Sequence, residues 1–391
     1  MTEQYIARRM ERIAPFYVMD LLAKAKQLEA AGRSVVHMEV GQPDFAAPAP
    51  VAAAGKAAID AGKTGYTPAT GIPELRQAIA DYYRDRFGLA IASHRIIVTP
   101  GSSGGLQLLM GVLINPGQEV LMTDPGYPCN KNFVEFVSGV PVSVPVGPET
   151  DYQLTAEMVR QAWTERTRAV LVASPANPTG TVLSRDALRE IYQVVRERGG
   201  VLIVDEIYQG LIYELEAFTA LDVADDIFVL NSFSKYFGMT GWRLGWIVAP
   251  PFFVDPIDCL AQNIFLSCSA PAQYAALEAF SADCLAIFEE RRQAFRRRRD
   301  FLLPALQRIG FSFPVLPGGA FYLYADCSGL TDDSFAFAYD LLSKQGVAVT
   351  PGKDFGSHRC SQHIRFAYTN SVENMAEGVR RIERYLAAGA A

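Results

Sequence analysis

One lysine, Lys235, lies in a setting suited to covalent chemistry. It follows an apolar run at 227–230 that is typical of a buried strand. A dry pocket and a nearby cation would lower the pKa of its amine, which could then form a Schiff base with an aldehyde. Ser232 and Ser234 precede it and Arg243 follows it, so these side chains could bind a phosphate, the arginine through its bidentate fork. A lysine beside a phosphate site suggests pyridoxal phosphate.

Two further charged residues interrupt apolar runs. Asp205 follows the branched residues 201–204, where a carboxylate would be costly to bury without a partner. It therefore predicts a cation, either a protonated pyridine nitrogen or an arginine of the protein. Arg365 lies within the apolar run 363–368, and a buried arginine needs an anion.

A turn rich in glycine and serine, at 100–105, joins the strand-like residues 96–99 to a helical pattern. Such a turn presents free backbone N–H groups and the positive end of a helix dipole, which suits a phosphate. The same turn also occurs as an ordinary connection between a strand and a helix. Its agreement with Lys235 and Arg243 favours phosphate binding.

The longer pattern around the lysine is specific. Ser-x-Ser-Lys followed by Gly-Met-Thr-Gly-Trp-Arg-x-Gly closely resembles the lysine motif of the class I aminotransferases, the aspartate aminotransferase family of fold type I. The resemblance runs from about Phe16 to Tyr385, and its motifs occur in the order of the family. They include Gly-Gln-Pro-Asp-Phe at 41–45, Asn-Pro-Thr-Gly at 177–180 and Asp-Glu-Ile-Tyr at 205–208.

The resemblance implies a role for each residue of the expected site. Lys235 would carry pyridoxal 5′-phosphate and move a proton, Asp205 would pair with the pyridine nitrogen, and Tyr208 would bond to the phenolic oxygen. The implied catalytic residues are Lys235, Asp205 and Tyr208. The implied cofactor-binding residues are Ser102, Ser103, Tyr127, Asn177, Asp205, Tyr208, Ser232, Ser234, Lys235, Arg243 and, from the neighbouring subunit, Tyr66. The implied substrate-binding residues are Gly41, Asn177 and Arg365, and no metal site is expected.

Strand-like and helical runs alternate from Arg95 onward, which predicts a largely parallel sheet covered on both faces. With the resemblance, we expect an α/β fold of type I. A large domain would hold a mostly parallel seven-stranded sheet covered by helices, beside a smaller α+β domain. The expected divisions are an N-terminal arm and helix packing with the small domain (1–45), the large cofactor-binding domain (46–285) and the small C-terminal domain (286–391). The basic stretch 289–299 is expected to be the solvated face of a long helix.

Composition limits the classes of partner and compartment. The 391 residues are half hydrophobic with a net charge of −6, and no segment has the length and purity of a membrane span. No secretory signal is visible, and six scattered cysteines favour reduced thiols in a cytoplasm. We expect neither nucleic acid nor membrane as a partner, and the resemblance implies a homodimer with shared active sites.

The implied activity is transfer of an amino group between an L-amino acid and a 2-oxo acid by a ping-pong mechanism. One alternative is another reaction on the same scaffold, such as β-elimination by a carbon–sulfur lyase or a cyclising synthase. A more distant alternative is a ligand-sensing module without catalysis. Such modules normally carry a DNA-binding domain, for which the residues before Phe16 leave no room.

The substrate side chain is less closely specified. Arg365 explains the binding of any α-carboxylate, whereas a dicarboxylic substrate needs a second cation. Some acidic-substrate members of the family place a lysine where this chain has Ser103. This departure favours neutral or aromatic donors, with 2-oxoglutarate or pyruvate as acceptor. Apolar surroundings for such donors are expected from Phe16, Tyr17, Ile264 and Phe265.

Overall fold

Seven strands form the central sheet of the computed structural model, which describes residues 5–13 and 15–389. Their order is β2-β8-β7-β6-β5-β3-β4, and only β8 runs antiparallel to its neighbours. The mostly parallel seven-stranded sheet is therefore confirmed. The strands are β2 (Ile96–Thr99), β3 (Glu119–Asp124), β4 (Val140–Pro145), β5 (Thr167–Ala173), β6 (Val201–Asp205), β7 (Phe228–Ser232) and β8 (Gly245–Val248).

Helices cover both faces of this sheet. Val170 and Val172 of β5 enter the cluster that contains α3 and α7, whereas Ala169 and Leu171 enter the cluster that contains α4 and α8. This alternation explains why β3, β5, β6 and β7 are largely apolar, since helices cover both of their faces. The edge strand β4 is partly exposed. The helices joined to these strands are α2 (Ala49–Asp60), α3 (Pro73–Phe87), α4 (Gly101–Leu113), α5 (Pro128–Phe136), α6 (Ala156–Ala162), α7 (Arg185–Glu197), α8 (Val254–Ile264) and α9 (Ala270–Glu278).

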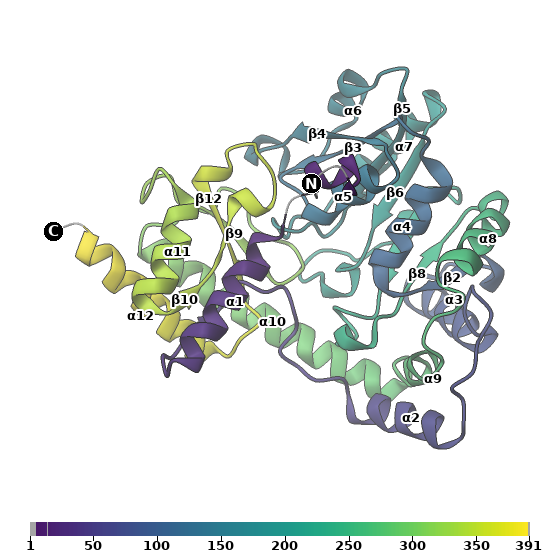
Figure 1. Ribbon diagram of the computed structural model, residues 1–391, viewed down its shortest axis with the longest axis horizontal. Helices are drawn as coiled ribbons and strands as arrows, with labels where there is room; N and C mark the ends of the chain where they lie inside the picture. Colours follow the sequence, from purple (N-terminus) through teal and green to yellow (C-terminus); the bar gives the residue numbers. More distant parts are fainter. Residues whose placement is uncertain (1–4, 14, 390–391) are drawn as a thin grey trace.

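A smaller part of the molecule combines the N-terminal segment from α1 onward with the C-terminal end of the chain (Figure 1). The residues before α1 instead contact α5 of the large part, where Arg9 bonds to Phe136 and Arg12 pairs with Glu135. The three-stranded antiparallel sheet of the smaller part has the order β11-β12-β9, and β1 pairs in parallel with β10. The alternation of residues 35–40 is typical of a short strand, but only two of these residues form β1. The elements are α1 (Tyr17–Ala30), β1 (Val36–His37), β9 (Tyr322–Asp326), α11 (Ser334–Gln345), β10 (Val347–Ala348), β11 (Thr350–Pro351), β12 (His363–Ala367) and α12 (Val372–Gly389).

The helix α10 (Ala282–Arg308) runs from the large part towards the smaller one (Figure 1). The expectation that its basic stretch is solvated is wrong for Arg298 and Arg299, which are buried. Arg298 forms a bidentate bond to Asp44 at 2.7 and 2.8 Å, and Arg299 bonds to Glu214 at 2.6 and 2.9 Å. A run of like charges is usually exposed, but these two guanidinium groups meet carboxylates from distant segments.

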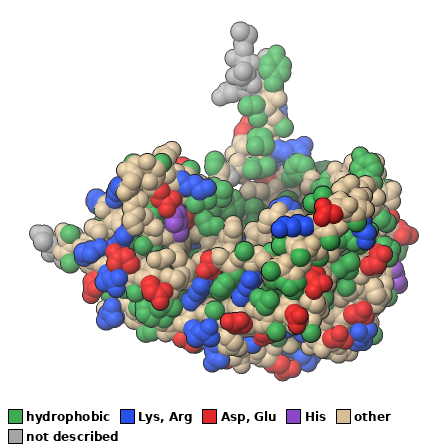
Figure 2. All heavy atoms as spheres, turned by 90° about the horizontal axis from the view of Figure 1, so that it is seen from below, with side chains coloured by type: hydrophobic (Ala, Val, Ile, Leu, Met, Phe, Trp, Pro, Cys, Tyr) green, Lys and Arg blue, Asp and Glu red, His purple; other side chains and the backbone are tan. Residues whose placement is uncertain are grey.

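The domain boundaries at 45 and 285 remain a prediction, and the second would fall within the first turn of α10. Within the described residues, no helix combines the length and apolar character needed to cross a bilayer. Basic and acidic side chains are interspersed over the face seen in Figure 2, without a broad region of one sign.

Candidate active site

A cavity of about 290 Å³ lies where the carboxyl ends of the central strands face the smaller part of the molecule. It is the switch-point location at which open α/β sheets bind ligands. Eleven of the thirteen predicted site residues line it; Ser232 and Tyr66 do not. The lining predicted residues are Gly41, Ser102, Ser103, Tyr127, Asn177, Asp205, Tyr208, Ser234, Lys235, Arg243 and Arg365, together with Phe16 from the expected substrate surroundings.

Lys235 occupies the turn after β7 and points into this cavity. Its Nζ donates a hydrogen bond to the carbonyl oxygen of Gly41 at 2.7 Å. Burial lowers the pKa of the lysine to about 8, helped by the charges of Arg365 and Arg243. About a tenth of the amine is therefore neutral at pH 7, which supplies the form that a nucleophile or base requires.

Gly41 brings its backbone close enough to accept this bond. A Cβ at position 41 would lie 1.8 Å from the hydroxyl oxygen of Tyr322, so any other residue would require the Tyr322 side chain to move. The hydroxyl of Tyr322 in turn lies 2.7 Å from that of Tyr208. The glycine thus allows three segments to converge beside the lysine amine.

Asp205 ends β6 and is 5% exposed. Its Oδ1 accepts the backbone N–H of Ile207 at 3.0 Å, and within the described residues no cationic nitrogen lies within ion-pair distance. Burial raises the pKa of the carboxyl to about 6, against the opposing effects of the Ile207 N–H and Lys235. Such a carboxylate fits a protonated ring nitrogen, because that cation would offset the cost of its burial.

A cradle for a phosphate surrounds the first turn of α4. Ser103, Ser234 and Arg243 line this side of the cavity. Gly101 has φ +70°, and a Cβ there would lie 2.5 Å from Nη2 of Arg243, so the glycine lets the guanidinium approach the helix N-terminus. Backbone N–H groups, hydroxyls and a guanidinium are the donors that bind phosphate oxygens.

Ser232 lies behind this cradle. Its Oγ accepts the backbone N–H of Ser234 at 3.0 Å and donates to the Ser234 hydroxyl at 3.0 Å. The carbonyl oxygen of Leu244, at 3.1 Å, is the alternative acceptor for the single proton of this hydroxyl. Since Ser232 orients Ser234 instead of lining the cavity, its contribution to phosphate binding would be indirect.

Arg365 comes from β12 and is 4% exposed. Its Nη1 donates to Oδ1 of Asn177 at 2.9 Å, its Nη2 donates to the carbonyl oxygen of Glu39, and its buried Nε has no hydrogen-bond partner in the described residues. The rings of Tyr322 and Phe355 lie 4.2 and 4.8 Å from the guanidinium carbon. A guanidinium fixed in this way, with a free donor, suits a carboxylate.

Several lining residues carried no signal in the sequence. Tyr322 and Phe355 contact Arg365, yet each lies in an apolar or glycine-rich run that resembles ordinary core or turn sequence. Gln42 and Thr240 also line the cavity. The Gly-Gly pair at 318–319 is typical of a turn before a strand, but it does not predict where the side chains of that strand point.

The expected apolar surroundings are met in part. Phe16 lines the cavity, whereas the ring of Tyr17 packs against Phe335 with centroids 5.3 Å apart. Ile264 and Phe265, at the end of α8, are not among the lining residues. Tyr66 is 86% exposed and does not line the cavity of its own chain.

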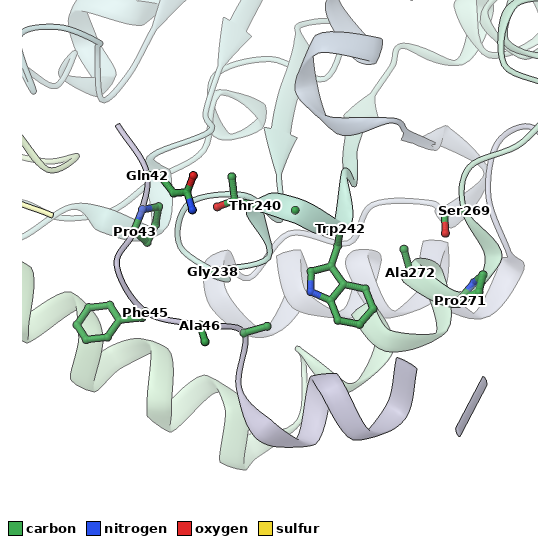
Figure 3. A pocket seen from close by; sticks show the side chains of 12 residues that line it. Gln42, Pro43, Phe45, Ala46, Gly238, Thr240, Trp242, Ser269, Pro271 and Ala272 are labelled. Atoms are coloured by element: carbon green, nitrogen blue, oxygen red, sulfur yellow. The ribbon is translucent and has the colours of Figure 1, made fainter. Parts of the chain in front are cut away.

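A second hollow, of about 420 Å³, opens beside the cavity and shares Gln42 and Thr240 with it. Figure 3 shows the indole of Trp242 at its floor, between Ala46 and the start of α9 at Pro271. The hollow is mainly lined by small and apolar residues. It offers a shallow surface of mixed polarity directly outside the cavity.

Comparison with known proteins gives full-length matches. Residues 33–382 match the family model for aminotransferase class I and II. The chain is 39% identical to the valine–pyruvate aminotransferase of Mycobacterium tuberculosis, over 96% of this chain and 97% of that one. It is 37% identical to the aspartate/prephenate aminotransferase of Thermus thermophilus, over 97% and 98%. A crystal structure of an aminotransferase from Mycobacterium tuberculosis has a TM-score of 0.94 at 38% identity, covering 98% of this chain and 99% of that chain.

Proposed function

Because the chain belongs to the class I and II aminotransferase family, we propose that its preferred amino donors are neutral or aromatic L-amino acids and its acceptor 2-oxoglutarate or pyruvate. The protein is a pyridoxal 5′-phosphate-dependent transaminase of fold type I, which moves an amino group between an L-amino acid and a 2-oxo acid in two half-reactions. The observation that carries the donor proposal is the distribution of charge within the cavity.

The site residues are assigned roles as part of this proposal. When bound, the cofactor supplies a ring that accepts the electron pair of the substrate α-carbon. Nζ of Lys235 removes the proton from that carbon, and the carboxylate of Asp205 keeps the ring nitrogen protonated. Arg365 binds the α-carboxylate, while Asn177 holds one arm of its guanidinium. Tyr208, with Tyr322, orients a hydroxyl towards the phenolic oxygen.

Three cationic side chains line the cavity within the described residues, and in this scheme each already has a role other than binding a distal carboxylate. Lys235 performs the proton transfer, Arg243 binds phosphate and Arg365 binds the α-carboxylate. A distal carboxylate would meet the hydroxyl of Ser103 instead of a cation, and an unpaired buried charge is costly. A neutral side chain would instead meet the apolar wall formed by Phe16, Val18, Met19, Ile207 and Phe355.

The relatives differ in the substrates that their names state. The Mycobacterium tuberculosis protein is named for valine and pyruvate, a neutral pair, and the Thermus thermophilus protein for aspartate and prephenate. Because the sequence identity to the two relatives is similar, it does not favour either substrate pair, and the residues that line the cavity must decide between them. Its apolar wall and the hydroxyl at Ser103 support the neutral pair.

Half-reaction kinetics test the donor proposal. The conversion of the bound cofactor to its amine form is followed spectroscopically with phenylalanine, leucine, alanine and aspartate. We expect specificity constants for phenylalanine and leucine at least equal to that for aspartate. Ser103→Lys should raise the aspartate constant by about tenfold, because it supplies the missing cation. Alanine as donor is the matched control, and its specificity constant should change little between the wild type and Ser103→Lys. A wild-type aspartate constant far above the other three would contradict the proposal.

We also propose that the enzyme is a homodimer with shared active sites, working in the cytoplasm. Tyr66 matches the family residue that reaches the neighbouring phosphate, and its high exposure leaves it free to do so. The hollow beside the cavity offers a surface for the second subunit. All six cysteines are free thiols, as in a reducing compartment. Recovery of the protein in a membrane or secreted fraction would count against the compartment.

Mixing two inactive variants tests the shared site. A dimer of one Tyr66→Phe chain and one Lys235→Ala chain should contain one intact site, since lysine and tyrosine would come from different subunits. Activity should rise after subunit exchange to about a quarter of the wild-type value, because half of the dimers are mixed and each has one repaired site. The matched control pairs Tyr208→Phe with Lys235→Ala, whose residues belong to one chain, and should restore nothing. Equal activity in both mixtures would argue against sharing.

A further inference from the structure

The start of α1 forms one wall of the active-site cavity. Phe16, Val18 and Met19 line it, and the ring of Phe16 meets that of Tyr127 edge-on, with centroids 6.2 Å apart. The position of this turn therefore sets the space open to a substrate side chain. The residue before the helix, Phe16, has no side-chain acceptor with which to cap it. A group from elsewhere in the chain must therefore hold the first turn of α1, and with it this wall of the cavity, in place.

Asp354 supplies the missing cap from a remote part of the chain. Its Oδ1 accepts the backbone N–H of Tyr17 at 2.8 Å, across a sequence separation of 337 residues. The side chain is buried, and its Oδ2 has no hydrogen-bond partner within 5–13 and 15–389. A carboxylate at a helix N-terminus satisfies free N–H groups and interacts favourably with the helix dipole.

The surroundings of Asp354 connect it to the substrate site on a second side. The next residue, Phe355, lines the cavity and packs on the Arg365 guanidinium. Burial raises the pKa of Asp354, while Arg365 and the N–H groups of Tyr17 and Val18 lower it. The aspartate thus lies between the apolar wall and the group assigned to the α-carboxylate.

We propose that Asp354 is a positioning residue that fixes the first turn of α1 and thereby selects for bulky apolar substrate side chains. This inference rests on the proposed function, because it takes the cavity beside Arg365 as the substrate site. Asp354 does not touch the reacting atoms. It acts through Phe16, Val18 and Met19, so its loss alters side-chain binding and leaves proton transfer intact.

Kinetics with two donors test the proposal on the holoenzyme. Asp354→Ala should raise KM for phenylalanine roughly fivefold, the effect of losing a helix cap, and leave kcat within about twofold. KM for alanine, whose side chain does not reach the wall, should change less than about twofold. Asp354→Asn retains an oxygen acceptor for the Tyr17 N–H and should resemble the wild type. Equal KM increases for both donors in both variants would point to lost charge near Arg365 and overturn the proposal.

Hydrogen exchange supplies a readout that does not depend on activity. In Asp354→Ala the amides at the start of α1 should exchange faster. The matched control is Asp333→Ala, because Asp333 caps α11 in the same way, accepting from Phe335 and Ala336 at 2.9 and 3.1 Å. Asp333→Ala should accelerate exchange at the start of α11 and leave KM for phenylalanine unchanged. An equal rise in KM would make the Asp354 effect one of general stability and refute the assignment.

A second pair of variants covers the case in which Asp354→Ala fails to fold. Tyr17→Pro and Tyr17→Ala both remove the ring, but only proline also removes the N–H that Asp354 accepts, and the first helical position tolerates proline. KM for phenylalanine should be higher in Tyr17→Pro; equal values would refute a role for this hydrogen bond. The wild-type donor panel separately tests the donor proposal, so a wild type that prefers aspartate is distinguished from a failure of Asp354.

Discussion

Replacing Lys235 by alanine should reduce turnover by at least about 10⁴-fold, because no other group would hold the cofactor covalently or move the α-proton. In the described structure Lys235 is the lysine that lines the cavity, with its amine held by the Gly41 carbonyl and its pKa lowered to about 8. The visible absorption of the covalently bound cofactor should disappear together with the activity. Steady-state assays and absorption spectra measure both effects.

Lys56→Ala provides a control, since this lysine is exposed on α2. It should retain wild-type activity and absorption. Borohydride reduction of the wild-type holoenzyme followed by peptide mapping identifies the lysine attached to the cofactor. A label on any other lysine would refute the assignment of Lys235.

The second large effect is expected from Asp205→Asn, which should slow removal of the substrate α-proton by about 10²- to 10³-fold, the loss typical of a preorganised charge. The asparagine keeps the shape of the side chain and can still accept the Ile207 N–H, but it cannot stabilise a ring cation. Exchange of the α-proton with solvent deuterium in a single turnover measures this step. An unchanged exchange rate would exclude the proposed role.

The neighbouring carboxyl of Glu206 offers a matched control. It is as deeply buried, and burial raises its pKa to about 8, but its oxygens accept bonds from Thr219 and from the Ala220 N–H outside the cavity. Glu206→Gln should therefore affect stability more than proton exchange. If it slowed exchange as much as Asp205→Asn, general loss of packing would explain both results.

The sequence predicted most of the cavity because its charged residues interrupt apolar strands. Asp205 and Arg365 stood out for that physical reason, and the motif around Lys235 added its neighbours. Tyr322 and Asp354 did not stand out. Tyrosine within an apolar strand and aspartate within a turn are ordinary choices, and their importance depends on residues far away in the chain.

The same limit explains the corrections to the fold. Arg298 belongs to a run of basic residues whose bidentate partner, Asp44, is distant in sequence. Local periodicity predicted the helix but could not predict that partner. The short β1 has a similar cause, since its length is set by pairing with β10, and pairing register is a property of the assembled sheet.

The contact between the segment that carries Glu39 and the C-terminal strands determines when the cavity can be completed during synthesis. The carbonyl oxygen of Glu39 accepts a bond from Thr350 across 311 residues and another from Arg365. On the ribosome the N-terminal segment emerges first, and the strands of the central sheet can pair before β10 and β12 exist. The segment that carries Glu39 is therefore made early but completed late, and a nascent chain cannot form the carboxylate-binding arginine site until nearly all of it has been made.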